Sequence, residues 1–188
     1  MLFDLGYRKD WHRLVPQTVD LLETAWPGIK VEKDIVEILH EGGVGSGRDG
    51  GVEAVILSHS HFDHIGSIAA LPKDVDLIVG PTFREVMMPG FPTNKQSSFY
   101  EADFDGRNVF EVPFNREQRI GRFESCGYFG DGSVQLLNVP GHAPGHICVL
   151  LRTTPDTHVL QGGDTTHFVG MSSLLVRIDN ALATVQVR

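Results

Sequence analysis

Four side chains that can bind a metal ion occur within a short stretch: His59, His61, Asp63 and His64. They follow the apolar residues 53–57, which are typical of a strand, and precede a predicted helix. Alternate residues of an extended segment face the same way, so we expect His59 and His61 to reach one cation together. Asp63 and His64, at the turn into the helix, can then reach a second cation beside it. Clustered imidazole and carboxylate groups are ligands that borderline divalent cations prefer.

Two later loops contain further candidate ligands. Residues 140–146 read Pro-Gly-His-Ala-Pro-Gly-His and supply His142 and His146. Glycine and proline reshape the backbone and allow it to approach a ligand site closely, although a tight turn with incidental histidines is an alternative explanation. A pair of glycines precedes Asp164 and presents its carboxylate, a pattern that a simple turn also explains.

The elements that must position these side chains alternate between strands and helices. Predicted strands cover residues 2–6, 53–57, 76–80, 108–112, 119–123, 134–139, 147–151 and 158–161. Predicted helices cover residues 15–26, 35–39, 65–71 and 82–88, and a glycine-rich loop covers residues 42–51. This alternation indicates an α/β layered domain.

The composition excludes several classes of protein. The 188 residues carry a net charge of −8 without a block of Lys or Arg, which disfavours nucleic acid as a partner. No apolar run approaches the roughly 20 residues that cross a bilayer, and no secretory signal begins the chain. Cys148 lies in an apolar run and is expected to be a reduced core thiol, so a disulfide scaffold is excluded. The composition therefore predicts a soluble cytoplasmic protein without a nucleic-acid or membrane partner, and it leaves the oligomeric state open.

Taken together, the three motifs resemble the metallo-β-lactamase superfamily. Its pattern is His-x-His-x-Asp-His, then Gly-His-x-x-Gly-His, then an aspartate after two glycines, and the order is the same here. Asp4-Leu5-Gly6 resembles the Asp-x-Gly element of that family. The lactonase-like branch is the most similar, and residues 8–11 and 128–132 resemble its fungal members. The resemblance implies an αββα sandwich.

The resemblance also implies a set of metal ligands: His59, His61, Asp63, His64, His142 and Asp164. His59, His61 and His142 would hold the first metal, Asp63 and His64 the second, and Asp164 would bridge both. The expected cofactor is Zn²⁺ at two sites, and manganese or iron also suits mixed His and Asp ligands. A further histidine normally completes the second site on a later strand, but only His167 follows Asp164.

The family's sandwich needs more strands and helices than this chain predicts, both before residue 2 and after residue 164. We therefore expect a chain that is truncated relative to the family. Residues 1–168 would form a partial metallo-β-lactamase-like domain, and residues 169–188 an atypical C-terminal tail.

The resemblance implies a metal-dependent hydrolase that cleaves an ester, lactone or thioester bond of a small-molecule substrate through a metal-activated hydroxide. Asp63 is the candidate catalytic residue, because it can orient the nucleophile and pass its proton to the leaving group. His146 and His167 are candidates for supporting the ligands or facing the substrate. Four aromatic residues are candidates for an apolar substrate wall: Phe62, Phe91, Tyr100 and Phe168.

Two alternatives remain open. Persulfide dioxygenases share the fold and use one iron held by two His and an Asp, so bound iron and oxygen consumption would favour that activity. A truncated, non-catalytic relative that binds metal for structure is the second alternative, and the missing final histidine supports it.

Overall fold

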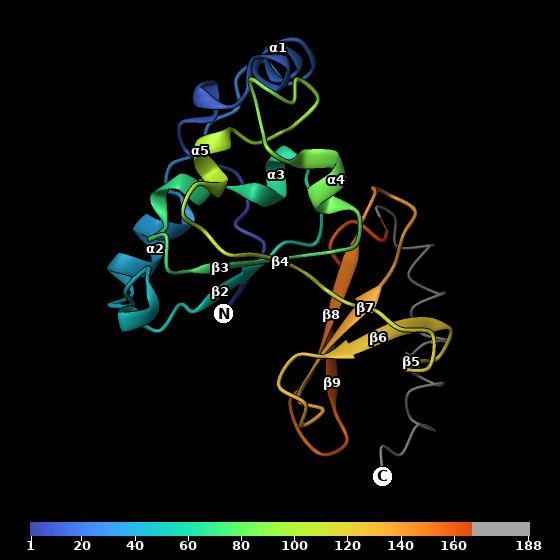
Figure 1. Ribbon diagram of the computed structural model, residues 1–188. Coiled ribbons are helices and arrows are strands. Elements are labelled where there is room, and N and C mark those ends of the chain that lie inside the picture. The colour runs from blue at the N-terminus through green and yellow to red at the C-terminus, as the bar shows by residue number, and fades with distance from the viewer. Residues whose placement is uncertain (167–188) are drawn as a thin grey trace.

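A parallel and an antiparallel β-sheet form the framework of the molecule (Figure 1). The structure is a computed structural model that describes residues 1–166. The parallel sheet contains, in spatial order, β1 (Leu2–Phe3), β2 (Ala54–Ile56), β3 (Asp76–Val79) and β4 (Val109–Glu111). The antiparallel sheet contains, in chain order, β5 (Arg119–Ile120), β6 (Phe123–Gly127), β7 (Val134–Asn138), β8 (Ile147–Arg152) and β9 (His158–Gln161).

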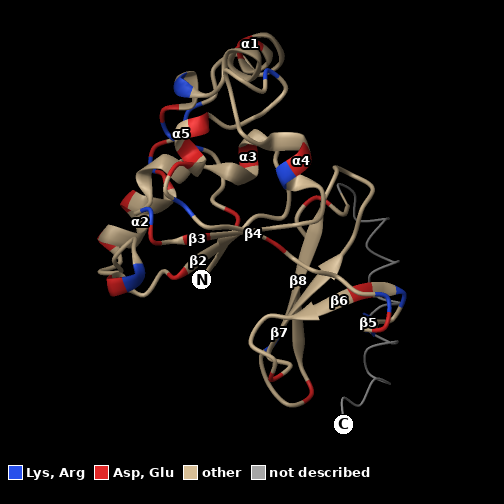
Figure 2. Ribbon diagram, viewed as in Figure 1, with Lys and Arg blue, Asp and Glu red and all other residues tan. Residues whose placement is uncertain are grey.

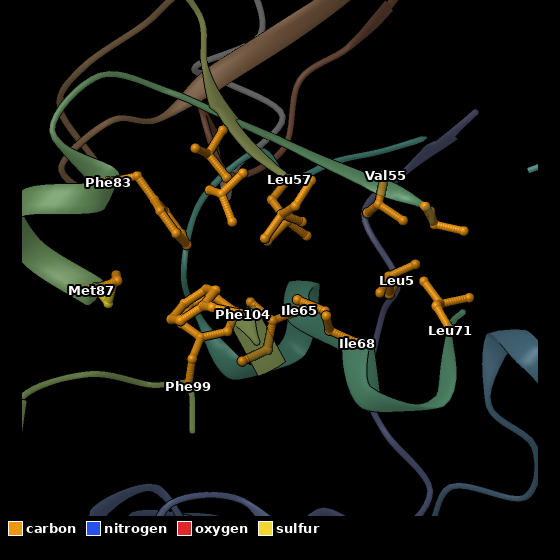
Figure 3. Close-up of a cluster of buried hydrophobic side chains, with 14 of the residues drawn as sticks. Leu5, Val55, Leu57, Ile65, Ile68, Leu71, Phe83, Met87, Phe99 and Phe104 are labelled. Atoms are coloured by element: carbon orange, nitrogen blue, oxygen red, sulfur yellow. The ribbon is translucent and has the colours of Figure 1, made fainter. Parts of the chain in front are cut away.

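Helices cover the face of the parallel sheet that points away from the antiparallel sheet (Figure 1). They are α1 (Pro16–Ala25), α2 (Ile35–Glu41), α3 (Phe62–Ile65), α4 (Phe83–Met87) and α5 (Glu101–Phe104). Short 3-10 helices occur at Trp11–Arg13, Arg48–Gly50 and Ile68–Ala70. Figure 3 shows the apolar core beneath this layer, where Phe83, Phe99 and Phe104 meet Val55 and Leu57 of the β2 segment.

The two faces of β2 explain how the layers are joined. Val55 points into the core below the helices, whereas Ala54 and Ile56 point into a second core against β7 and β8. Successive residues of a strand face opposite sides, so a strand that is buried on both sides must be apolar throughout. The result is a helix–sheet–sheet arrangement, which confirms the predicted α/β layered class.

The two predicted N-terminal helices are confirmed. α1 begins at Pro16, where the missing N–H of proline costs nothing, and ends before the exposed Trp26. α2 is capped by Asp34, whose Oδ1 accepts from the Glu37 N–H at 3.0 Å. The Glu37 Oε2 accepts from the Asp34 N–H at 3.1 Å, which completes a capping box.

Two predicted elements were wrong. The helix expected over residues 65–71 is interrupted at Gly66 (φ 49°), where a Cβ would lie 2.4 Å from the Leu5 Cβ. Residues 119–123 form two strands instead of one, because Gly121 (φ 59°) turns the chain between β5 and β6. α5 was not predicted; its first turn is stabilised by the Tyr100 N–H, which donates to Asp103 Oδ2 at 2.8 Å.

Charge and cysteine positions are consistent with an acidic chain built on an apolar core. Lys and Arg lie interspersed with Asp and Glu over the described elements (Figure 2). Both Cys126 and Cys148 are free thiols, and burial raises the pKa of Cys148 to about 12. None of the helices within residues 1–166 has the length and apolar character needed to cross a membrane.

Candidate metal centre

The candidate ligands meet at one edge of the two sheets. β1 and β2 are parallel, so the segments that follow them, with Asp4 and with residues 58–64, leave the sheet at the same edge. The β7–β8 loop and the end of β9 lie at that edge too, because β7, β8 and β9 are antiparallel neighbours. A backbone hydrogen bond of 2.9 Å from the Ile147 N–H to the Ser58 carbonyl joins the two sheets there. Residues far apart in the chain are thereby brought together.

The first group of ligand atoms comes from three histidines and one aspartate. His59, His61, His142 and Asp164 each place one ligand atom within 4.8 Å of the others. His61 Nδ1 lies 3.0 Å from His142 Nε2, and His142 Nε2 lies 3.4 Å from Asp164 Oδ2. His59 Nε2 lies 3.9 Å from the same Asp164 oxygen.

The second group contains Asp63, His64 and, again, Asp164, also within 4.8 Å of one another. His64 Nε2 lies 3.1 Å from Asp164 Oδ1 and 3.7 Å from Asp63 Oδ2. The two carboxylate oxygens of Asp164 therefore face different groups: Oδ2 faces His59 and His142, and Oδ1 faces His64. This is the geometry of a carboxylate that can bridge two cations.

The environment of His59 fits a metal ion. Its side chain is buried, and among residues 1–166 its Nε2 has no hydrogen-bond partner. Burial, assisted by the neighbouring His64, lowers the pKa of His59 to about 3, so the ring is neutral at pH 7. An unpaired buried polar atom costs about 1–3 kcal/mol, and coordination of a cation would remove that cost. Imidazole and carboxylate donors together suit zinc, manganese or iron.

Asp4 contacts the second group through the ring nitrogen of His64 that does not face Asp164. Its Oδ2 lies 2.8 Å from His64 Nδ1, and its Oδ1 accepts from the Ser58 N–H at 2.7 Å. Burial lowers the pKa of His64, but the hydrogen bond to Asp4 and the nearby carboxylates outweigh burial and raise it above its usual value. A carboxylate on one ring nitrogen directs the other nitrogen toward the metal. The Asp-x-Gly pattern was the only signal in the sequence for this residue.

His146 lies outside both ligand groups but contacts one of them. Its side chain is fully buried, and its Nε2 accepts from the backbone N–H of Asp164 at 3.0 Å. Gly163 makes this approach possible: a Cβ there would lie 2.8 Å from His146 Nε2 and 2.7 Å from Ser58 Cβ. Of the two expected supporting histidines, His146 thus holds the Asp164 turn, whereas His167 lies outside the described residues.

Aromatic side chains lie next to the ligands. The ring of Phe62, between two candidate ligands in the chain, contacts Tyr7 (centroids 5.7 Å apart) and Trp26 (6.0 Å). Tyr7 is 42% exposed and Trp26 54% exposed. Burial raises the pKa of Tyr7, and so do Asp63 and Asp164, which places its hydroxyl within their electrostatic influence. We call Tyr7, Phe62 and Trp26 the aromatic cluster.

Of the other expected wall residues, Phe91 and Tyr100 pair with each other, with centroids 5.7 Å apart. The Tyr100 hydroxyl donates to the Leu14 carbonyl, at 3.2 Å. Phe168 lies outside the described residues. The sequence did not single out Tyr7 or Trp26, because their proximity to Phe62 depends on where α1 and β1 are placed.

Comparison with known protein families identifies the family to which this chain belongs. Residues 46–180 match the family model described as the metallo-beta-lactamase superfamily. The chain belongs to this superfamily, and the predicted family is confirmed.

Curated relatives and solved structures extend the comparison. The chain is 42% identical over 177 residues to the metallo-hydrolase mfmC of Annulohypoxylon moriforme, covering 91% of this chain and 46% of that protein. It is 44% identical over 175 residues to the gamma-lactamase FDB1 of Fusarium pseudograminearum, covering 90% of this chain and 41% of that protein. The chain thus spans less than half the length of these fungal relatives. An N-acyl homoserine lactone hydrolase, solved with N-hexanoyl-L-homoserine at its catalytic metal centre, shares the fold (TM-score 0.55, 24% identity, 84% of this chain and 56% of that one).

Proposed function

We propose that this chain is a hydrolase that uses two divalent cations, zinc in the first instance, to open an ester, lactone or thioester. The observation that carries the proposal is the placement of Asp164, whose two oxygens face separate groups of candidate ligands. The relative named as a gamma-lactamase adds the γ-lactam, the amide counterpart of a lactone, to the substrates worth testing.

His59 Nε2, His61 Nδ1 and His142 Nε2 would hold one cation, and His64 Nε2 and Asp63 the other. Asp164 would contribute one oxygen to each. When bound, such a pair of cations supplies an activated water and polarises the oxygen of the bond to be cleaved.

Asp63 is the proposed catalytic residue. Its side chain is 30% exposed and lies on the first turn of α3, so the carboxylate is accessible to solvent. From there it can accept a hydrogen bond from the attacking water and carry the proton to the leaving group. The buried His59 and His146 have no comparable access, which favours Asp63 for this role.

The aromatic cluster supports a substrate that has an apolar portion. Tyr7 and Trp26 each expose a substantial part of an aromatic ring next to Phe62, which lies between the candidate ligands His61 and Asp63 in the chain. Such surfaces lower the free energy of an apolar group that covers them. We therefore propose a small molecule with an apolar ring or acyl chain next to its hydrolysable bond.

The test has two stages, metal content and then hydrolysis. Elemental analysis of the purified chain should give close to two zinc ions per molecule. The loaded protein is then assayed with a lactone, a γ-lactam and a thioester, together with Asp63→Asn and the control Asp20→Asn, an exposed position of α1. We expect Asp63→Asn to lower kcat by at least a hundredfold and Asp20→Asn to leave it unchanged.

Three outcomes would overturn the proposal. Equal activity in the two variants would remove Asp63 from the mechanism. Bound iron with oxygen consumption on a glutathione persulfide would instead indicate a dioxygenase. A fully folded, zinc-loaded chain without activity on any of these substrates would indicate a non-catalytic metal-binding protein.

A further inference from the structure

Ser58 occupies a fully buried position between β2 and the first candidate ligand. Its N–H donates to Asp4 Oδ1 at 2.7 Å, and its hydroxyl lies 2.8 Å from Asp4 Oδ2. The same hydroxyl oxygen lies 2.9 Å from His59 Nδ1. The Ser58 hydroxyl therefore contacts both the Asp4 carboxylate and the His59 ring.

The direction of these hydrogen bonds follows from counting protons. A serine hydroxyl has one proton to donate, and an ionised carboxylate can only accept. The contact with Asp4 Oδ2 therefore takes the Ser58 proton. The contact with His59 Nδ1 is then a hydrogen bond only if Nδ1 carries a proton and donates it to the Ser58 oxygen.

This arrangement decides which nitrogen of His59 is available to a metal. A neutral imidazole has one proton, so protonation of Nδ1 leaves a lone pair on Nε2. Nε2 is the buried atom without a partner among residues 1–166, and it faces Asp164 Oδ2 at 3.9 Å. The hydroxyl of Ser58 thus selects the ligand atom.

The same reasoning applies to His64, whose Nδ1 lies 3.4 Å from the Ser58 hydroxyl but is closer to the Asp4 carboxylate. Its Nδ1 lies 2.8 Å from Asp4 Oδ2, which requires a proton on Nδ1 and directs Nε2 toward Asp164 Oδ1. Asp4 consequently acts on His64 directly and on His59 through Ser58. One carboxylate orients a ring in each of the two ligand groups.

We propose that Ser58 is a positioning residue that fixes His59 with its proton on Nδ1 and its Nε2 free, and that it connects His59 to Asp4, the carboxylate that also orients His64. The consequence for catalysis rests on the proposed function, but the protonated nitrogen is a property of the metal-free chain and is tested there.

Nitrogen-15 NMR of the histidine-labelled, metal-free protein at pH 7.5 reports which ring nitrogen carries the proton, with the His59 signals assigned from their loss in His59→Gln. We expect protonated Nδ1 and unprotonated Nε2 in the wild type. In Ser58→Ala, His59 should shift to the form protonated on Nε2, whereas His64 should keep its Nδ1 proton. The control is Ser60→Ala, a second buried serine of the same loop, which should leave both rings unchanged.

The wild-type spectrum alone can overturn the proposal: a His59 ring protonated on Nε2 would refute it whether or not any variant folds. An unchanged His59 spectrum in Ser58→Ala would refute it as well. Zinc titration adds a second readout, in which Ser58→Ala should weaken binding by about 10- to 100-fold, the usual effect of removing a hydrogen-bond partner of a ligand.

The failures of the two proposals are distinguishable. The expected NMR result without hydrolysis of any substrate would count against the proposed function and leave the role of Ser58 standing. Active hydrolysis with a His59 ring protonated on Nε2 would count against Ser58 and leave the function standing.

Discussion

The backbone N–H of Asp164 donates to the ring of the buried His146 over 3.0 Å. His146 belongs to neither group of candidate ligands, yet it holds the turn that carries the residue common to both. For this hydrogen bond, Nε2 must be unprotonated and the proton must be on Nδ1, which has no partner within residues 1–166. The neutral ring is thus part of the framework of the site.

Replacement of His146 should therefore weaken metal binding without removing a ligand. His146→Leu deletes the acceptor and should lower zinc affinity by about 10- to 100-fold. His146→Gln keeps an acceptor in a similar position and should retain most of the affinity. Isothermal titration with Zn²⁺ measures both, and His158→Leu, at an exposed position of β9, is the control. Equal affinity in His146→Leu and the wild type would contradict the role of this contact.

The same burial predicts how stability depends on pH in the metal-free protein. Burial lowers the pKa of His146 to about 4 and that of His59 to about 3, whereas an unfolded histidine titrates at about 6.5. Above pH 6.5 the rings are neutral in both states and contribute nothing to the pH dependence. As the pH falls below 6.5, the unfolded chain takes up protons that the folded protein excludes, so stability declines.

Urea unfolding at pH 7.5 and pH 5.0 measures this decline. The pKa difference of His146 alone corresponds to about 2 kcal/mol lost at pH 5. His146→Gln cannot titrate and should lose correspondingly less stability between the two pH values. An identical pH dependence in wild type and variant would mean that His146 is not the neutral buried ring described above.

Gly163 should tolerate no side chain. Its φ is +51°, and an added Cβ would lie 2.7 Å from Ser58 Cβ and 2.8 Å from His146 Nε2. Gly163→Ala should therefore displace the Asp164 turn and lower zinc stoichiometry below that of the wild type. Gly130→Ala is the matched control, because Gly130 also has a positive φ (+76°) but would meet nothing within 4 Å. The control should lose only about 1 kcal/mol of stability and keep its metal.

The aromatic cluster should affect apolar substrates selectively. Trp26→Ala removes an exposed ring beside Phe62 and should lower kcat/KM for a lactone with a long acyl chain by about 5- to 30-fold, equivalent to about 1–2 kcal/mol of apolar contact. The unsubstituted lactone should be cleaved at its original rate. Leu21→Ala, at an exposed apolar position of α1, is the control. Equal losses on both lactones would show that Trp26 acts through folding instead of substrate contact.

The sequence predicted well those features that depend on local pattern. The strand before His59, the capped helix α2 and the three strands from residue 134 onward were found because periodicity and capping residues act over a few positions. The six candidate ligands were also predicted as a set, and the structure brings them together, although their binding of metal remains a prediction.

Features that depend on contacts between distant segments were not predictable from the sequence. The break after α3 arises because Gly66 must pass within reach of Leu5, from another part of the chain. Likewise, nothing in the sequence distinguishes Ser58 or Trp26. Ser58 gains its role from contact with Asp4, which follows β1, and Trp26 gains its role from contact with Phe62. For the same reason, the sequence does not decide whether His146 supports the ligands or is simply part of a tight turn.

The distance in sequence between the two ends of the ligand set has a further consequence. His59 follows the parallel sheet, and Asp164 follows the last strand of the antiparallel one, so a cation shared by them would close a loop of about a hundred residues. Cross-links across long loops restrict the unfolded chain most strongly. The metal would thus act as a reversible cross-link between the two sheets, and a chelator would lower the stability of the whole domain as well as disrupt the metal centre.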